Sequence, residues 1–360
     1  MRSGNLRPSP YLYFMITIPS RRETFAFFVL FYLLFCSSRA GAQSTPVAPS
    51  AYNFGPLDQV LNSYQKPLDK DLTVLLYKNG KVLYKKEMGE SKANIPVAVG
   101  STSKWLTIAL LMTFVDQGKL SLDDKVSTYL PIFKTYGKAY ITIRQCLTHF
   151  TGLASAGLGN IRLGRYASLE EEVNDLVKRE IKTNPGTEFV YTDAGFEIVG
   201  RVLEVITKKP FDRLIKETLF RPLLMQRSTF TSEHAVEPAE GALCTPAELL
   251  NFTAMILGKG VFNGKRILSE QSIAEMLKTA VPPAQIKAYP LGVDGYNYAL
   301  GAWIPTTDDS VIVAPSLTGS WAFVDFQHQY AAVIVVTKSF NEPKKQAFVA
   351  IKEAMDAAVK

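Results

Sequence analysis

Apolar and polar positions follow a two-residue period in a region near the N-terminal end of the chain. Runs at 72–77 and 82–86 are rich in β-forming residues and flank Asn79-Gly80, a dipeptide typical of a two-residue hairpin turn. The preceding residues 57–64 have the spacing of a short amphipathic helix. This region therefore predicts a helix followed by a β-hairpin.

The middle of the chain has a helical period, and the β pattern returns late. A helix with an apolar stripe is predicted over 101–118, where Gly118 stops it. Residues 119–290 continue as helical segments joined by polar loops, the clearest at 196–206, 211–219, 246–257 and 269–278. Strands are predicted at 298–304, 321–326 and 331–337, and a final helix at 344–359. Strands at both ends predict an α+β fold, a sheet closed by the two termini with an inserted helical lobe.

The first 42 residues have the three parts of a secretory signal. Arg21-Arg22 precede an uncharged apolar run at 25–36, and Ala40 and Ala42 follow it. The run is shorter than the ~20 residues that span a bilayer. We therefore predict a signal peptide over 1–42, cleaved after Ala42, and a periplasmic or secreted protein. An uncleaved anchor, a lipid anchor on Cys36 and a start at Met15 are the alternatives.

Downstream of the signal, residues 43–56 are rich in Ser, Pro and Ala and predict a linker. We expect one domain over 57–360, with a sheet lobe formed by 57–125 and 285–360 and a mainly helical lobe over 126–284. The remaining cysteines, Cys146 and Cys244, lie in apolar settings, which favours buried free thiols over a disulfide.

The basic net charge does not indicate a nucleic-acid partner. The chain has 40 Lys and Arg against 33 Asp and Glu, but five of these basic residues and one acidic residue lie in 1–42. The rest of the chain has a net charge of +3 and lacks a basic run that would follow phosphates. We therefore expect no nucleic-acid partner, and a membrane contact only through an uncleaved leader.

Ser101-Thr-Ser-Lys104 has the form S-x-x-K and opens the helix predicted over 101–118. Residues i and i+3 share a helix face, so the Lys104 amine is expected beside the Ser101 hydroxyl. A desolvated lysine with a lowered pKa is able to activate serine as a nucleophile, and the helix start favours a nearby oxyanion. The other interpretation is that Ser101 only caps the helix.

Five blocks in order give this motif a context. They are Gly100-Ser-Thr-Ser-Lys104, residues 116–124 (DQGKLSLDD), 142–153 (TIRQCLTHFTGL), 184–195 (NPGTEFVYTDAG) and 298–303 (YALGAW). Together they resemble the serine β-lactamase-like hydrolases, which include class C β-lactamases, D-alanyl-D-alanine carboxypeptidases and family VIII esterases. The resemblance covers roughly residues 55–357. It implies a β-lactamase/transpeptidase-like fold with an antiparallel sheet, and an active site between the lobes.

The family's second motif, Tyr-x-Asn, corresponds to Tyr191-Thr192-Asp193. The resemblance implies that Tyr191 shuttles protons together with Lys104. Asp193 departs from the family pattern, because an ionised carboxylate only accepts hydrogen bonds. We expect Asp193 either to hold Lys104 charged, which weakens that lysine as a base, or to cap the helix that follows.

The family's third motif, which carries a Lys, a His or Trp-Gly-Gly on an inner strand, is altered in this chain. The equivalent stretch is Ala314-Pro315-Ser316 or, with a shifted register, Leu317-Thr318-Gly319. Neither contains the Lys or His that binds the carboxylate of penicillins and D-alanyl peptides in the family. A backbone N–H at Ser316 or Leu317 is expected to complete the oxyanion hole with the Ser101 N–H.

These residues predict an exported serine hydrolase that forms an acyl-enzyme on Ser101 and acts on small esters or amides. Two alternatives remain: a non-catalytic protein that binds peptidoglycan or a partner, and a β-lactamase or D-alanyl-D-alanine carboxypeptidase. The block around His149 is expected to be a structural turn. His234 and His328 have no partners at metal-ligand spacing, and no phosphate loop is present in the sequence, so we expect no metal and no cofactor.

Overall fold

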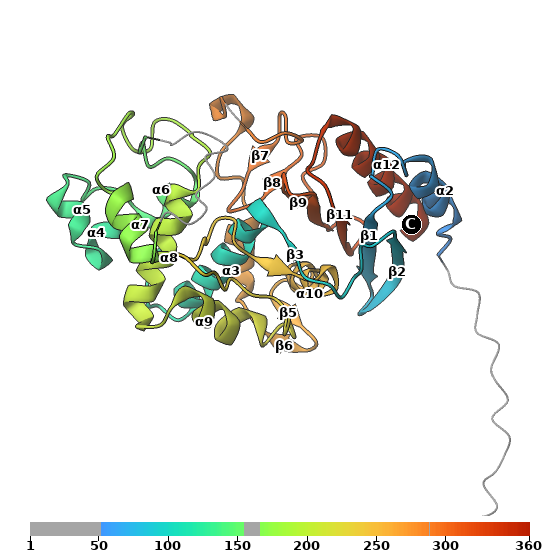
Figure 1. Cartoon of the computed structure of the whole chain (residues 1–360), viewed down its shortest axis with the longest axis horizontal. Coiled ribbons are helices and arrows are strands. Elements are labelled where there is room, and N and C mark those ends of the chain that lie inside the picture. Colours follow the sequence, from blue (N-terminus) through green and yellow to red (C-terminus); the bar gives the residue numbers. More distant parts are fainter. Residues whose placement is uncertain (1–51, 155–165, 288) are drawn as a thin grey trace, which may run out of the picture. The chain divides into compact units, whose positions relative to one another are not determined.

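A seven-stranded antiparallel sheet lies along one side of the molecule, in the order β2-β1-β11-β10-β9-β8-β7 (Figure 1). The sheet contains strands from both ends of the domain and thereby confirms the predicted fold class. Its strands are β1 (Leu72–Lys78), β2 (Lys81–Met88), β7 (Asn297–Tyr298), β8 (Trp303–Ile304), β9 (Val311–Pro315), β10 (Ser320–Asp325) and β11 (Tyr330–Val336).

The structure is a computed structural model that describes residues 52–154, 166–287 and 289–360. The predicted signal peptide over 1–42 and most of the predicted linker over 43–56 lie outside these residues. Helix α2 (Gly55–Ser63) begins within the last two residues of that linker. In the described part of the chain, no helix combines the length and the apolar character needed to cross a membrane.

The first hairpin forms where the sequence predicts it. Asn79 and Gly80 have φ values of 53° and 80°, which are the positive angles that a type I′ turn requires. This turn joins β1 and β2 with Leu72 opposite Met88. At the other edge of β1, Leu72 lies opposite Val336 of β11, so the two ends of the domain are adjacent in the sheet.

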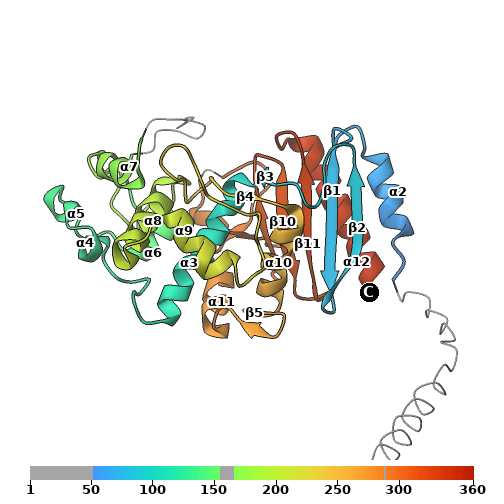
Figure 2. The same cartoon turned by 60° about the horizontal axis from the view of Figure 1, so that its bottom comes forward.

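Helices cover both faces of the sheet (Figure 2). Val74 and Leu76 of β1 point to the face where α2 and the C-terminal helix α12 (Glu342–Val359) pack together. Leu75 points the other way, to the face against which α10 (Pro246–Leu257) packs. The period of two in β1 therefore divides the core into two layers. Because α10 lies on the sheet, one helix of the segment predicted as the helical lobe belongs to the sheet's own layer.

The helical lobe is built around α3 (Ser103–Asp116), which contacts α8 (Ala194–Thr207) and α11 (Glu270–Leu277). Every residue from Ser103 to Phe114 is buried. The predicted apolar stripe is thus a helix buried on all sides, as is typical of a central helix. The remaining helices of eight or fewer residues are α4 (Val126–Tyr129), α5 (Ile132–Thr135), α6 (Ile143–Leu147), α7 (Leu169–Leu176) and α9 (Phe211–Ile215).

The single strand predicted over 298–304 is wrong. Residues 298–304 are not continuous but make a tight hairpin of β7 and β8. Gly301 in its turn has a φ of 74°, and a Cβ there would lie 2.8 Å from the Ile108 side chain and 3.1 Å from the Lys104 backbone. A glycine is required because the turn packs directly on α3. Cys146 and Cys244 are buried free thiols, as expected.

Candidate active site

Ser101 lies in a 3₁₀ turn, Gly100–Thr102, that leads directly into α3. The turn packs closely on the end of β9. Gly100 has a φ of 48°, and a Cβ at this position would lie 2.3 Å from Ser316 Oγ. Only glycine fits such a position without strain. The Ser101 side chain remains partly exposed, and its hydroxyl donates to Glu240 Oε1 at 2.9 Å.

Lys104 lies one turn further along and is buried, with 1% of its side chain exposed. Its ammonium donates to Asp193 Oδ1 at 2.8 Å and lies 3.7 Å from Glu240 Oε1. Burial alone would lower the pKa of Lys104, but the charge of Asp193, reinforced by that of Glu240, outweighs it and raises this pKa. Lys104 is therefore an ammonium ion at neutral pH and not a neutral amine.

Tyr191 and Asp193, on the loop before α8, both lie beside the Lys104 ammonium. The Tyr191 ring is buried, with its centroid 5.0 Å from Lys104 Nζ. Burial raises the pKa of Tyr191, against the opposing effects of the Lys104 charge and of a side-chain hydrogen bond with Ser101. Asp193 makes no side-chain cap to α8. Of the two roles expected for Asp193, the structure supports the one in which it holds Lys104 charged.

His149 packs behind this loop, with its ring centroid 4.4 Å from that of Tyr191. Its Nδ1 accepts from the Thr192 N–H at 3.2 Å, so the ring proton is on Nε2, 2.9 Å from the Tyr298 hydroxyl. Burial, reinforced by the Lys104 charge, lowers the pKa of His149 to about 3. His149 is thus a neutral positioning residue for the Tyr191 loop.

The turn between β9 and β10 forms the other wall of the site. The Ser316 hydroxyl oxygen accepts from the Ser101 N–H and from the Thr318 N–H, each at 3.2 Å. These two donors converge on one oxygen atom, as an oxyanion hole requires. The Ser316 N–H itself donates to Ser320 O. The Ser316 N–H, one of the two donors expected from the sequence, is therefore engaged within the β9–β10 turn.

Leu317 lies in the same turn, with an exposed side chain and a carbonyl that accepts from the Phe340 N–H; its own N–H stays a predicted donor to the oxyanion. No Lys, Arg or His occurs at 314–319. The turn therefore offers the site no cation of its own, in either register of the third motif.

Glu240 is the residue that the sequence did not single out. It is brought to Ser101 by a pairing between distant segments: β3 (Val97–Ala98) lies antiparallel to β4 (Leu243–Cys244). The Val99 N–H also donates to Ala242 O, and the Ala242 N–H donates to Ser103 Oγ. These bonds fix the loop of Glu240 beside the turn of Ser101. No local motif marks this contact, because it depends on the tertiary fold.

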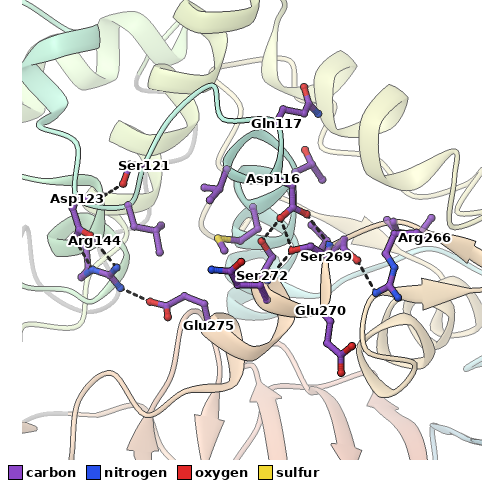
Figure 3. Close-up of a pocket in the computed structure, with 17 residues that line it drawn as sticks. Asp116, Gln117, Ser121, Asp123, Arg144, Arg266, Ser269, Glu270, Ser272 and Glu275 are labelled. Carbon is purple, nitrogen blue, oxygen red and sulfur yellow. Dashed lines mark hydrogen bonds and ion pairs between the residues drawn. The ribbon is translucent and has the colours of Figure 1, made fainter.

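Two other polar features lie away from Ser101. A cleft of about 970 Å³ is lined by the end of α3, by α11 and by Arg144 (Figure 3). Several of its charged groups already have partners: Asp116 accepts from Ser269 and Ser272, and Arg144 binds Asp123 and Glu275. The second feature is a set of possible metal ligands among the described residues, which comprises Asp325, His328 and Asp356. The Lys352 ammonium already binds both of its carboxylates.

Comparisons with known proteins agree with the observed fold. The family model described as "Beta-lactamase" matches residues 66–356. Penicillin-binding protein 4 of Amycolatopsis lactamdurans is 28% identical over 242 residues, which cover 57% of this chain and 62% of that protein. The chain spans less than two thirds of the length of the first curated relatives that it matches.

Two solved structures share the fold. A penicillin-binding protein homologue from Caulobacter crescentus has a TM-score of 0.72 at 14% identity, and covers 87% of this chain and 99% of its own. EstCE1, a hydrolase with promiscuous acyltransferase activity, has a TM-score of 0.68 at 18% identity, and covers 84% of this chain and 98% of its own.

Proposed function

Because the chain belongs to the beta-lactamase family, we propose that it is an exported serine hydrolase that cleaves small neutral esters or amides through an acyl-enzyme on Ser101. The observation that carries the proposal is the contact of Glu240 Oε1 with both the Ser101 hydroxyl, at 2.9 Å, and the Lys104 ammonium, at 3.7 Å. Through Glu240, the serine and the lysine of the S-x-x-K motif belong to one cluster of a hydrogen bond and an ion pair, with Tyr191 beside them, which supports Ser101 as the nucleophile.

In this function the Ser101 oxygen attacks the substrate carbonyl, and the carbonyl oxygen becomes an oxyanion. The convergence of the Ser101 and Thr318 N–H groups on one oxygen, that of Ser316, supports an oxyanion site at this point. The fixed positive charge of Lys104 stabilises the negative charge that develops in the site. Lys104 acts as an ammonium, so the role of base that the motif suggested for it passes to another group.

The charges around Ser101 support a neutral substrate. Asp193 and Glu240 supply two carboxylates against the single ammonium of Lys104, and the β9–β10 turn adds no cation. A charge-assisted hydrogen bond to a substrate carboxylate contributes about 1.5–3 kcal/mol, or roughly 10–150-fold in rate. A substrate that carries a carboxylate would forgo this contribution here.

The test compares kcat/KM for a neutral butyrate ester and an anionic cephalosporin. We expect the ester to be favoured by at least about tenfold. A preference for the cephalosporin would overturn the substrate assignment and favour a β-lactamase or carboxypeptidase.

A non-catalytic binding protein is the second candidate, favoured by one observation: the Ser316 hydroxyl occupies the two N–H donors that an oxyanion needs. Mass spectrometry after exposure to a fluorophosphonate separates the two functions. An adduct on Ser101, absent in Ser101→Ala, supports the hydrolase. An unlabelled Ser101 with both a fluorophosphonate and a fluorescent penicillin supports the binding protein.

Export remains part of the proposal and rests on the sequence of residues 1–42 alone. The mature protein is expected to begin at Gln43, in the periplasm or outside the cell. N-terminal sequencing of the native protein tests this, and recovery of residues 25–42 on the purified protein would replace cleavage by an anchor.

A further inference from the structure

The Glu240 carboxylate is in direct contact with the proposed nucleophile Ser101, whose side chain also hydrogen-bonds Tyr191. Its Oε1 accepts the Ser101 hydroxyl proton at 2.9 Å, within the 2.6–3.2 Å that a general base requires. With 47% of its side chain exposed, Glu240 also faces the solvent from which a substrate arrives. Strand β4 follows Glu240 in the chain, and it pairs with β3, which leads into the turn of Ser101. Backbone hydrogen bonds therefore hold the segments of the two residues next to each other.

The other titratable groups that face this point are poorly suited to accept the proton. Lys104 on α3 is held as an ammonium by Asp193 at 2.8 Å and has no free lone pair. The Tyr191 hydroxyl also hydrogen-bonds the Ser101 side chain, but burial raises the pKa of this phenol, so it keeps its own proton. His149 is turned away, because its Nδ1 accepts from the Thr192 N–H and its Nε2 lies against Tyr298.

We propose that Glu240 is the general base of this site, accepting the Ser101 proton on Oε1 as the acyl-enzyme forms. The proposal rests on the serine-hydrolase function and names a residue that its motifs do not include. The Lys104 ammonium, 3.7 Å from Oε1, then serves to orient the carboxylate and to balance its charge.

Acylation of Ser101 is the first half of the reaction. The Ser101 Oγ–H bond breaks, its proton moves to Glu240 Oε1, and Oγ forms a bond to the substrate carbonyl carbon. The carbonyl π electrons move to oxygen, return to re-form the double bond, and expel the leaving alkoxide or amine. The leaving group takes the proton from Glu240. In the second half, water loses a proton to Glu240, attacks the acyl carbon, and Ser101 leaves with that proton.

The first test is Glu240→Gln, which keeps the size of the side chain and removes its capacity to take a proton. We expect kcat/KM for the butyrate ester to fall about 10²–10⁴-fold, the usual contribution of a general base. The matched control is Glu233→Gln, the same change at an exposed position of the same segment, which should leave turnover unchanged. Thermal unfolding should be alike in the wild type and both variants.

The second test separates chemistry from positioning. In Glu240→Ala, added formate is expected to restore turnover in proportion to its concentration, because a small carboxylate enters the space left by the side chain. Formate should restore nothing in Ser101→Ala. Rescue by formate but not by formamide supports proton transfer to a carboxylate. Equal rescue by both, or no rescue in a folded variant, would assign Glu240 a structural role.

The outcomes distinguish this inference from the proposed function. If Ser101 of the wild-type protein takes up a fluorophosphonate and turns over the ester, while Glu240→Gln is as active or more active, then the hydrolase stands and Glu240 is not its base. If the wild-type Ser101 is unreactive, the proposed hydrolase function is wrong, and so is the role proposed for Glu240.

Discussion

Lys104 and Lys352 each lie between two carboxylates, and the surroundings of these two lysines differ in one respect. Lys104 binds Asp193 at 2.8 Å and lies 3.7 Å from Glu240. Lys352 of α12 binds Asp325 at 2.9 Å and Asp356 at 2.8 Å. Each cluster includes a tyrosine: Tyr191 at the first, and Tyr330 at the second, where its hydroxyl donates to Asp356.

The two clusters differ in the hydrogen-bond donors that their carboxylates accept from. In the Lys352 cluster they are engaged by fixed N–H and O–H donors: the His328 backbone and ring, the ammonium and the Tyr330 hydroxyl. In the Lys104 cluster, Glu240 accepts from the partly exposed hydroxyl of Ser101, the proposed nucleophile. A carboxylate satisfied by structural donors holds the fold together. One that accepts from a reactive hydroxyl is available for chemistry.

The largest effect, a loss of unfolding free energy, is expected from a substitution of Lys352. Lys352→Met leaves Asp325, which is fully buried, without its ammonium partner. Removing one partner of a buried ion pair costs about 3–5 kcal/mol. We expect the free energy of unfolding to fall by about that amount, with kcat/KM of the folded protein unchanged, as measured by urea unfolding and an ester assay.

The control for this change is Lys259→Met. Lys259 makes an exposed ion pair with Glu270 at 3.4 Å, and such pairs contribute less than about 1 kcal/mol. Equal losses of stability in the two variants would contradict the structural role of the Lys352 cluster.

An intermediate effect is expected for Asp193→Asn. This change removes the charge that raises the pKa of Lys104 most, and so lowers the pKa of Lys104. It also replaces a charge-assisted hydrogen bond, so we expect a loss of about 1.5–3 kcal/mol in unfolding free energy. The site becomes less negative, and the ratio of cephalosporin to ester turnover should rise. The control is Asp309→Asn at an exposed position. An unchanged ratio would show that Asp193 does not govern substrate charge.

The smallest effect is expected at Ser316. Ser316→Ala removes the hydroxyl that occupies the N–H groups of Ser101 and Thr318. Freeing one neutral hydrogen bond of about 0.5–1.5 kcal/mol corresponds to a rise of roughly two- to tenfold in kcat. Steady-state kinetics with the ester measure this rise. A fall in kcat would instead make the Ser316 hydroxyl a donor to the oxyanion.

Local patterns predicted the parts of the fold that depend on neighbours in sequence. Asn79-Gly80 marked the first hairpin, and the helix predicted over 246–257 coincides with α10 (Pro246–Leu257). The S-x-x-K spacing likewise marked the start of the buried helix, with Ser101 in the turn that leads into α3 and Lys104 in its first turn. These features are set by turn geometry and helix period, which a single sequence contains.

The features of the fold and of the site that the sequence did not predict depend on contacts between distant segments. The run at 298–304 has the composition of one strand, but its glycine turns back on α3 and splits it into β7 and β8. Glu240 reaches Ser101 because β3 pairs with β4, and two-residue strands have no recognisable period. The donor pair of Ser101 and Thr318 also depends on the register of the β9–β10 turn.

The pairing of β1 with β11 has a consequence for how the chain folds. Leu72 lies opposite Val336, so the sheet cannot close until nearly the whole domain has been synthesised. Such long-range pairings slow folding, because a large loop must be ordered before its contacts form. Until then the β1–β2 hairpin presents an unpaired apolar edge, a site where nascent chains associate wrongly. A domain arranged in this way stays unfolded after synthesis for longer than a helical bundle of equal length, and depends on its last strand to leave that state.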